Sequence, residues 1–530
     1  MQKLLLGDEA LAQGAIDAGI SGVYAYPGTP STEITEYIQN SKQAEELNIR
    51  CDWMVNEKTA MEAAIGMSYA GKRSIVCMKH VGLNVAADAY MNSAIVGTNG
   101  GLVVVVADDP SMHSSQNEQD SRVYGQFALI PTLEPSNQQE CYDMVQYGLD
   151  YSEKYNVPVL LRLTTRIAHS RAGVKTRETR KQNELRIPEN LKQYVLLPAI
   201  SKRNYKALLE KQNNFIDSSE NDGWNKYIDG NNKKYGIITA GISYNYLMEN
   251  YLDRNVPYPV VKISQYPLPV DMINKLAKET DELIVIEEGY PFIEDQIKGI
   301  IKSDLVVHGR KDGTLPRTGE LNPNLVASAL GLDNNQYNTI PEIVKPRPPK
   351  LCNGCPHSST YLALNDALKD YKPGRVFADI GCYTLGALPP YNAINSCVDM
   401  GASITMGIGA YESGLDPVVS VIGDSTFTHS GMTGLLDAVL AKVSITVIIL
   451  DNETTAMTGG QDSAAYTRIE NICKGIGVDP DHIMIFNPIP RNHDANVEII
   501  KKELEYKGVS VIIPRRECIQ VIGKPKSRRK

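Results

Sequence analysis

The sequence predicts an α/β protein made of three units, each built on a mostly parallel β-sheet. Short runs of consecutive apolar residues, such as residues 102–107, alternate with helical stretches such as residues 57–69. Such continuous runs indicate strands that are covered by helices on both faces. At 530 residues the chain is too long for one ordinary core, and the usual size of domains suggests about three folding units.

The N-terminal unit is expected to span residues 1–190. Its predicted strands lie at residues 23–26, 74–78, 102–107 and 157–163, and its clearest helices at residues 10–18 and 57–69. Residues 191–234 are polar and charged, so we expect them to form a connection with some helix.

The second unit is expected at residues 235–340, with strands at residues 235–240, 260–263 and 283–287. Residues 341–350 contain Pro346, Pro348 and Pro349, which favour a stiff, extended linker. The third unit, residues 351–523, is expected to have strands at residues 375–380, 418–422, 445–450 and 510–514. The basic residues of 524–530 are typical of a solvated tail.

The composition argues against several classes of protein. Hydrophobic residues make up 42% of the chain, and no apolar run approaches the ~18 residues of a membrane helix, so we expect a soluble protein without a membrane partner. The net charge of −8 argues against nucleic acid as a partner. Nine cysteines do not indicate a disulfide scaffold, and the first apolar stretch is too short for a signal peptide, so a cytoplasmic location is expected.

Two strand ends of the third unit carry a candidate metal site. Gly423, Asp424 and Ser425 follow one predicted strand, and Asn452 follows the next. Ligands bind outside the carboxyl ends of strands in open α/β sheets, and carboxylate and amide oxygens suit Mg²⁺ together with diphosphate oxygens. A Gly-Asp-Ser sequence alone is more often a surface turn, but Asn452 at the second strand end strengthens the prediction.

With these residues the sequence resembles thiamine diphosphate enzymes and, more narrowly, the α-subunit family of indolepyruvate ferredoxin oxidoreductases. The general motif has glycine where this chain has Ser425, but serine is usual in this subfamily. The resemblance covers most of the chain and rests on ordered motifs: Tyr26-Pro-Gly-Thr-Pro-Ser-Thr-Glu-Ile34, Val55-Asn-Glu-Lys58, Lys79-His-Val-Gly-Leu-Asn-Val-Ala-Ala-Asp88, His113-Ser-Ser-Gln-Asn-Glu-Gln-Asp120, Cys352-Asn-Gly-Cys-Pro-His357, Gly423-Asp-Ser-Thr-Phe-Thr-His-Ser-Gly431 and Asp451-Asn-Glu-Thr-Thr-Ala-Met-Thr-Gly459.

The resemblance implies a role for each unit. The first would bind the pyrimidine of thiamine diphosphate, the second would be like the C-terminal unit of transketolase, and the third would bind the diphosphate and Mg²⁺. The active site would then lie between the first and third units. The cofactor-binding residues implied are Gly423, Asp424, Ser425, Asn452, Gly401 and Ala402, with Asp424 and Asn452 as Mg²⁺ ligands.

The reaction implied is the ferredoxin-dependent oxidative decarboxylation of aryl 2-oxo acids such as indolepyruvate. It would use coenzyme A, pass through a thiamine ylid and an enamine, and give an aryl-acyl-CoA and CO₂. A smaller β subunit and ferredoxin are the expected partners, in a dimer of heterodimers. Two alternatives stay open: a non-oxidative thiamine diphosphate decarboxylase or carboligase, and a non-catalytic subunit.

The carboxylate that hydrogen-bonds the aminopyrimidine ring in this chemistry corresponds by resemblance to Glu57. Taken alone, a glutamate in the first turn of a helix faces solvent and interacts favourably with the helix dipole. Small residues on the same helix, including Ala60 and Ala64, would let a flat ring approach. Glu62 lies about 140° around the helix from Glu57, so only one of them can face the cofactor, and we select Glu57.

Thr29 and His80 each follow a predicted strand and are candidates to hold the carboxylate and carbonyl of a 2-oxo acid. Each has an ordinary alternative: Thr29 could cap the helix that begins near Ser31, and His80 could be a loop histidine. Arg122 is a further candidate partner for the substrate carboxylate.

Four cysteines of the third unit could converge at one sheet edge, because Cys352, Cys355, Cys382 and Cys518 come from separate loops. Four thiolates suit an iron–sulfur cluster or tetrahedral zinc. The resemblance favours one [4Fe–4S] cluster near the thiamine. Family members usually end in a segment dense in Cys-x-x-Cys-x-x-Cys, which does not follow Cys518 here, so we expect electrons to leave through another subunit or directly. Packing roles are expected for Cys51, Cys77, Cys141, Cys397 and Cys473.

Overall fold

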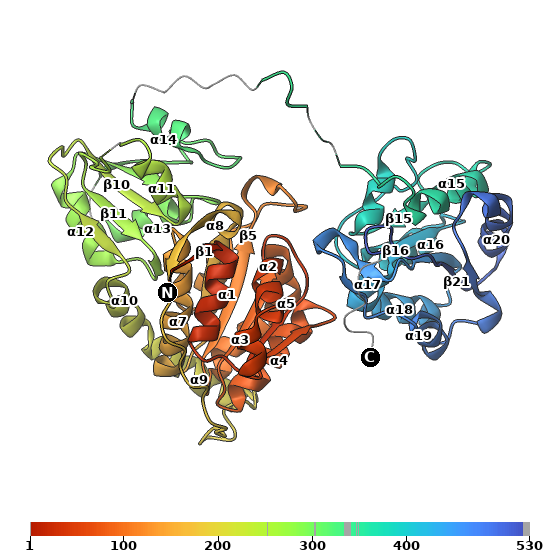
Figure 1. Ribbon diagram of the computed structural model, residues 1–530, viewed down its shortest axis with the longest axis horizontal. Helices are drawn as coiled ribbons and strands as arrows, with labels where there is room; N and C mark the ends of the chain where they lie inside the picture. The colour runs from red at the N-terminus through yellow and green to blue at the C-terminus, as the bar shows by residue number, and fades with distance from the viewer. Residues whose placement is uncertain are drawn as a thin grey trace. The chain divides into compact units, whose positions relative to one another are not determined.

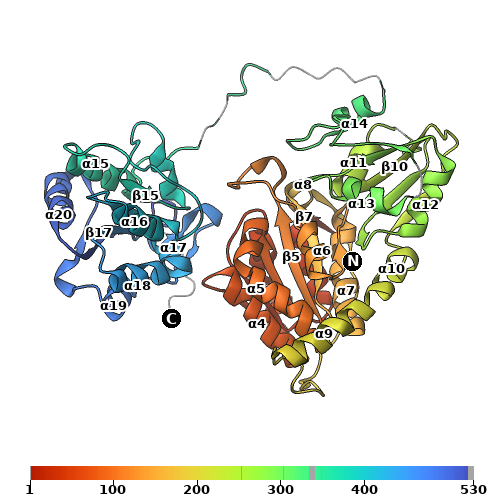
Figure 2. The same cartoon turned by 180° about the vertical axis from the view of Figure 1, so that it is seen from behind.

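The computed structural model describes residues 2–251, 253–301, 304–332, 341–345, 347 and 349–522. It divides the chain into two compact units, Met1–Asn338 and Thr339–Lys530, both of the α/β class (Figures 1 and 2). Pro346 and Pro348 of the predicted linker and the predicted basic tail at 524–530 lie outside the described residues.

The first unit contains a seven-stranded sheet whose strands are parallel to their neighbours, except that the edge strand β12 is antiparallel to β6. Every residue of β5, with the sequence Leu-Val-Val-Val-Val-Ala-Asp, is buried, as expected for a strand covered on both faces. The strands, in spatial order, are β12 (Gln265–Tyr266), β6 (Thr132–Leu133), β7 (Val159–Thr164), β5 (Leu102–Asp108), β4 (Ser74–Lys79), β2 (Gly22–Ala25) and β3 (Arg50–Trp53).

Helices cover this sheet in front and behind, as the two opposite views show (Figures 1 and 2). Helix α1 packs against α7, and α4 packs against α5. The helices are α1 (Gly7–Asp17), α2 (Thr32–Gln39), α3 (Lys42–Glu46), α4 (Glu57–Tyr69), α5 (His80–Val96), α6 (Arg122–Ala128), α7 (Gln138–Tyr155) and α8 (Thr165–His169). A separate antiparallel ribbon joins β1 (Gln2–Leu6) to β8 (Arg171–Lys175).

A five-stranded sheet completes the first unit. Its order is β14 (Val306–His308), β13 (Glu282–Ile286), β10 (Tyr235–Ala240), β11 (Val260–Ile263) and β9 (Lys226–Ile228), with only β9 antiparallel. Its helices are α11 (Ile242–Met248), α12 (Val270–Glu279), α13 (Phe292–Ile300) and α14 (Pro323–Ala329), and the predicted connection holds α9 (Pro198–Glu210) and α10 (Gln212–Asn221).

The first two predicted units form one compact unit, because β12 leaves the second of them and pairs with β6 in the first sheet. Sequence reasoning had separated the two, and it missed this exchange because a two-residue strand gives no pattern. The domain boundaries drawn from the sequence stay predictions.

The second compact unit contains a fully parallel five-stranded sheet. Its order is β15 (Val376–Ala378), β16 (Val419–Gly423), β17 (Ile445–Leu450), β21 (Val509–Pro514) and β20 (Ile483–Phe486), and β18 (Thr454–Thr455) pairs with β19 (Gln461–Asp462) in a small ribbon. Its α-helices are α15 (Pro356–Leu368), α16 (Ala402–Glu412), α17 (Asp424–Thr426), α18 (Met432–Ala441), α19 (Ile469–Ile476) and α20 (His493–Glu505). Across the described part of the chain, no helix is long and apolar enough to cross a membrane.

Candidate functional site

The first sheet brings three predicted residues to one edge. Thr29 lies in the turn after β2, Glu57 begins α4 after β3, and His80 begins α5 directly after β4. Because β3, β2 and β4 are parallel neighbours, their carboxyl ends meet at the same edge of the sheet.

Glu57 is buried, with 5% of its surface exposed, and therefore does not face solvent as the alternative interpretation would have it. Its carboxylate lies against α5, where a Cβ atom added to Gly82 would be 2.5 Å from Glu57 Oε1. Asn56 caps the helix by accepting a hydrogen bond from the Thr59 amide at 2.9 Å. Glu62, on the same helix, is exposed and pairs with Lys58. Of the two glutamates, only Glu57 points into the protein.

The structure does not place Thr29 as a helix cap or His80 in a loop, which were the ordinary alternatives for these two residues. The N-cap of α2 is Ser31, so Thr29 does not cap this helix. His80 has 1% of its surface exposed; its Nε2 lies 3.0 Å from the Asn117 carbonyl, and its Nδ1 has no hydrogen-bond partner among the described residues. Because a carbonyl oxygen only accepts, Nε2 carries the hydrogen of this hydrogen bond.

Sequence reasoning missed Lys79, which connects these residues. Its side chain packs on the Thr29 turn, because a Cβ atom added to Gly28 would lie 3.2 Å from Lys79 Cδ. Its ammonium group donates to the Ser114 carbonyl at 3.2 Å. Burial lowers the pKa of Lys79, while the nearby Asp109 and Glu57 carboxylates favour its charged form. Its position at the end of β4, next to His80, was the available signal.

Arg122 does not fit the predicted contact with a substrate carboxylate. It has 1% of its surface exposed and belongs to an ion network that we define as Asp108, Asp120, Arg122, Glu134, Arg162 and Glu287. Arg162 also donates to the backbone carbonyl of Glu288. Its guanidinium lies 2.5 Å from Asp120 and 3.0 Å from Glu287, and it donates to the Tyr266 hydroxyl at 3.2 Å. All three of its nitrogens already have protein acceptors, so the prediction for Arg122 is corrected to a structural role.

The ion network joins the ends of strands from both sheets of the first unit. Arg162, in β7, pairs with Asp108 at 2.6 Å and with Glu134 at 2.5 Å. Burial raises the pKa of Asp120, but the guanidinium groups of Arg122 and Arg162 outweigh it and hold the pKa at about 2. Burial raises the pKa of Glu287 and of Glu288 to about 7, against the opposing effect of neighbouring arginines.

In the second unit, Asp424 and Asn452 follow two neighbouring strands. Gly423, the last residue of β16, lies opposite Leu450, the last residue of β17. Asp424 Oδ1 accepts a hydrogen bond from the Ser425 amide at 2.8 Å, whereas its buried Oδ2 has no hydrogen-bond partner in the described part of the chain. Burial, and then the Asp451 carboxylate, raise the pKa of Asp424 to about 8. A divalent cation would neutralise this site, so the residues fit Mg²⁺.

His357 orients the amide of Asn452. The two side chains are buried, and Asn452 Nδ2 lies 3.3 Å from His357 Nε2. Burial lowers the pKa of His357 to about 4, so the neutral ring accepts this hydrogen bond. Asn452 Oδ1 is thereby kept as the acceptor, which is the atom a metal requires. His357 was quoted in a motif but was not predicted as a site residue.

The remaining predicted cofactor residues surround Asp424 and the start of α16. Gly423 has no room for a side chain, because a Cβ atom would lie 2.6 Å from the Tyr383 ring. Ser425 Oγ is 2.7 Å from Thr455 Oγ1. Gly401 has φ +95° and leads into Ala402, the first residue of α16.

Asp379, which sequence reasoning missed, binds the first turn of α16. Its carboxylate accepts a hydrogen bond from the Ser403 amide at 3.3 Å. Burial raises the pKa of Asp379 to about 6. The diphosphate contact expected at Gly401 and Ala402 stays a prediction.

The four predicted ligand cysteines gather near this edge. Cys518 donates its backbone N–H to the Asn452 carbonyl at 3.1 Å. Burial, followed by the nearby Cys518, Cys355 and Cys352 and then by Asp424, raises the pKa of Cys382 to about 12. Across the described residues, no three of these sulfurs lie within 4.8 Å of one another. The four cysteines lie near one another, and the kind of centre that they would hold stays a prediction.

The other cysteines match their predicted packing role only in part. Cys77, Cys141 and Cys473 are buried and Cys51 is half-buried. Cys397 is exposed, so its predicted packing role is wrong. It lies in the loop before α16 and is not among the residues of the hydrophobic core.

Comparison with known proteins gives matches at both ends of the chain. Residues 13–214 match the family "Pyruvate flavodoxin/ferredoxin oxidoreductase, thiamine diP-bdg", and residues 379–513 match "Thiamine pyrophosphate enzyme, C-terminal TPP binding domain". The indolepyruvate oxidoreductase subunit IorA of Archaeoglobus fulgidus is 37% identical over 97% of this chain and 86% of its own length. IorA of Pyrococcus abyssi is 37% identical over 97% of this chain and 85% of its own length.

A solved structure has a similar fold. It is the 2-oxoglutarate:ferredoxin oxidoreductase from Magnetococcus marinus with 2-oxoglutarate, coenzyme A and succinyl-CoA bound. The TM-score is 0.51 at 17% sequence identity, and the match covers 62% of this chain and 65% of that chain. This likeness concerns the fold, including its mostly parallel sheets.

Proposed function

The chain belongs to the family of indolepyruvate oxidoreductase IorA subunits, within the thiamine diphosphate-dependent oxidoreductases, and we propose that it catalyses the ferredoxin-dependent oxidative decarboxylation of aryl 2-oxo acids such as indolepyruvate. Coenzyme A would accept the acyl group, and CO₂ would be released. The observation that carries this proposal is the gathering of Asp424, Asn452 and four cysteines at one sheet edge.

Asp424 and Asn452 are proposed to hold Mg²⁺, with Gly401 and Ala402 next to the diphosphate. The unpartnered Oδ2 of Asp424 supports this assignment, because a buried carboxylate oxygen without a partner is costly unless a cation binds it. His357 fixes the amide of Asn452 through its hydrogen bond. Thiamine diphosphate, when bound, supplies the carbanion chemistry that decarboxylation of a 2-oxo acid requires.

Glu57 is proposed to hydrogen-bond the aminopyrimidine ring. It is the buried one of the two candidate glutamates, and its carboxylate already lies against α5. Thr29 and His80 are proposed to hold the carboxylate and carbonyl of the substrate, with an Nδ1–H of His80 donating to a substrate oxygen. The unpartnered, buried Nδ1 supports the assignment for His80.

Cys352, Cys355, Cys382 and Cys518 are proposed to hold one [4Fe–4S] cluster, which would accept electrons. The proximity of the four thiols, and the hydrogen bond from the Cys518 amide to the Asn452 carbonyl, support one shared centre at this edge. A smaller β subunit and ferredoxin are the proposed partners, in a dimer of heterodimers. The cytoplasmic location expected from the sequence stays a prediction.

The proposal is tested with the full chain, which is co-expressed with its β subunit and purified anaerobically. We expect iron and acid-labile sulfide in the protein, and reduction of ferredoxin that depends on indolepyruvate, coenzyme A and thiamine diphosphate together. Release of CO₂ without ferredoxin reduction, in a protein that contains no iron, would favour the non-oxidative alternative. A protein that binds no thiamine diphosphate would be a non-catalytic subunit.

A further inference from the structure

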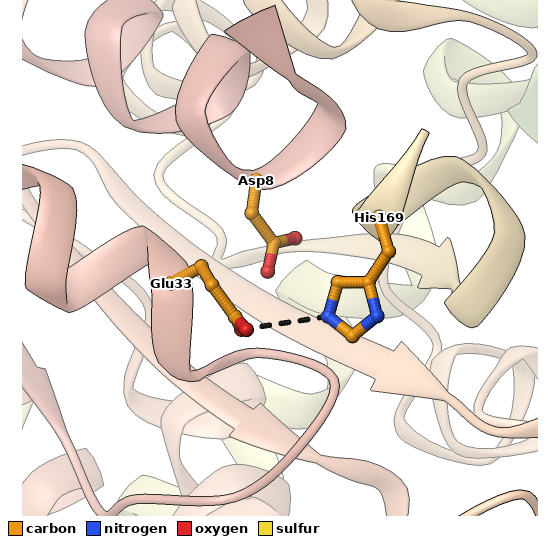
Figure 3. A group of neighbouring side chains, drawn as sticks. All are labelled: Asp8, Glu33 and His169. Atoms are coloured by element: carbon orange, nitrogen blue, oxygen red, sulfur yellow. Dashed lines mark ion pairs between the residues drawn. The ribbon is translucent and has the colours of Figure 1, made fainter. Parts of the chain in front are cut away.

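Three side chains of the first unit form a cluster that has no part in the proposed reaction. Asp8 lies in the first turn of α1, Glu33 in the first turn of α2, and His169 at the end of α8. Their ligand atoms all lie within 4.8 Å of one another, and His169 Nε2 is 3.5 Å from Glu33 Oε2. Figure 3 shows the three side chains pointing toward one another from these helices.

Asp8 is the observation that points to a ligand. It is completely buried, and neither of its carboxylate oxygens has a hydrogen-bond partner among the described residues. It does not cap α1, because the Leu6 amide donates to Glu9 at 2.8 Å instead. Burial, followed by the Glu33 carboxylate, raises the pKa of Asp8 well above its usual value. A buried carboxylate without a partner destabilises the fold unless a cation compensates it.

The other two side chains reach solvent and provide a way in. The side chain of Glu33 is 36% exposed and that of His169 is 34% exposed, while Asp8 is sealed. Glu33 also lines a surface cleft that contains further acidic residues, among them Glu9 and Glu36. The cluster is therefore connected to solvent through Glu33 and His169, while Asp8 forms its buried side.

We propose that Asp8, Glu33 and His169 bind one divalent cation of the Mn²⁺ type. Two carboxylates and one imidazole suit first-row ions that accept both oxygen and nitrogen ligands. Three protein ligands leave positions for water. The ion would tie the starts of α1 and α2 to the end of α8, and would thereby fix the helix that follows the Thr29 turn. This inference does not depend on the proposed reaction.

The experiment uses the full chain and Mn²⁺ alone. Mn²⁺ prefers oxygen and nitrogen ligands, so the cysteines compete little. The Asp424→Ala variant serves as the background, because it removes the other proposed oxygen site. Binding is followed by the loss of the free-ion electron paramagnetic resonance signal and by the thermal midpoint, which a bound ion raises. We expect one Mn²⁺ per chain in this background.

Adding Asp8→Asn or His169→Gln should weaken this binding by more than roughly tenfold, a loss expected even for residues that only support a ligand. Adding Glu36→Gln, in the same cleft but outside the cluster, should leave it unchanged. If Asp8→Asn does not fold, the partly exposed His169→Gln carries the test. The proposal is overturned if the background chain binds no Mn²⁺, or if His169→Gln and the folded Asp8→Asn bind it as the background does.

Discussion

Two buried polar regions of this protein differ in how their charges are balanced. In the ion network, the guanidinium groups of Arg122 and Arg162 meet the carboxylates of Asp120, Glu287, Asp108 and Glu134 at 2.5–3.0 Å. At the edge of the five-stranded sheet of the second unit, Asp424 Oδ2 has no hydrogen-bond partner within the described residues, and the Asp451 carboxylate adds to the effect of burial in raising the pKa of Asp424. We call a buried charge balanced when protein groups of opposite charge pair with it, and unbalanced when none does. The difference teaches that a balanced buried charge stabilises the fold, whereas an unbalanced one indicates a ligand site.

Removing a cysteine ligand should give the largest effect. Cys382→Ala should abolish ferredoxin or viologen reduction and bleach the broad visible absorbance, because one cluster ligand is lost, while thiamine diphosphate still binds. Absorption spectra and reduction assays under anaerobic conditions check this. Cys473→Ala is the matched control, since Cys473 is buried in the core of the same unit and should affect neither. Unchanged absorbance in Cys382→Ala would show that Cys382 is not a ligand of the cluster.

The second prediction concerns Glu57, which is buried in the first unit as the ion network is, but does not belong to that network. Glu57→Gln should keep the fold and most of the cofactor affinity but slow hydrogen–deuterium exchange at C2 of the bound cofactor by roughly 100-fold or more. Glu62→Gln, on the exposed side of the same helix, should exchange like the wild type. Equal exchange rates in Glu57→Gln and Glu62→Gln would contradict the role proposed for Glu57.

Breaking the balanced region should affect stability. Arg122→Ala removes the guanidinium that lies closest to Asp120 and Glu287, and should lower the free energy of unfolding by about 3–5 kcal/mol in a urea titration. The control is Arg166→Ala, since Arg166 pairs with Glu320 while more than half exposed, and should cost about 0–1 kcal/mol. If both variants lose the same amount, the network does not hold the first unit together.

The smallest expected effect is a change in pH dependence. Burial raises the pKa of Glu288 to about 7 from its ordinary 4.5, so its contribution to stability is present below the ordinary pKa and is lost as the pH rises through about 7. Glu288→Gln keeps an oxygen that can accept from the Leu321 amide but cannot ionise. Thermal midpoints measured across this range should fall less steeply in the variant. Parallel curves would show that Glu288 does not titrate there.

The sequence predicted the fold where the pattern is local. Strands β10, β11 and β17 and helix α4 lie at the predicted residues, because buried parallel strands are continuously apolar and α4 begins with a capping asparagine. Strand β3, with the sequence Arg-Cys-Asp-Trp, lies at the sheet edge and has no apolar run, so it was missed.

Part of the candidate site could be proposed from the sequence. Motifs mark Glu57 in the first unit, and they mark Asp424, Asn452 and the four cysteines in the second unit. The role of Arg122 could not be predicted, since its partner Glu287 is far away in the chain and ion pairs between distant segments leave no periodic signal. The cluster of Asp8, Glu33 and His169 could not be predicted for the same reason, because its residues come from three separate helices.

The central claim, that an unbalanced buried acceptor marks the cofactor site, is tested most directly by calorimetric titration of thiamine diphosphate with Mg²⁺ into Asp424→Ala. The account predicts that metal-dependent binding is lost, because Mg²⁺ loses its charged protein ligand while the diphosphate remains anionic. Asp437→Ala, an exposed aspartate of α18, should bind like the wild type. Wild-type affinity in a folded Asp424→Ala protein would contradict the claim.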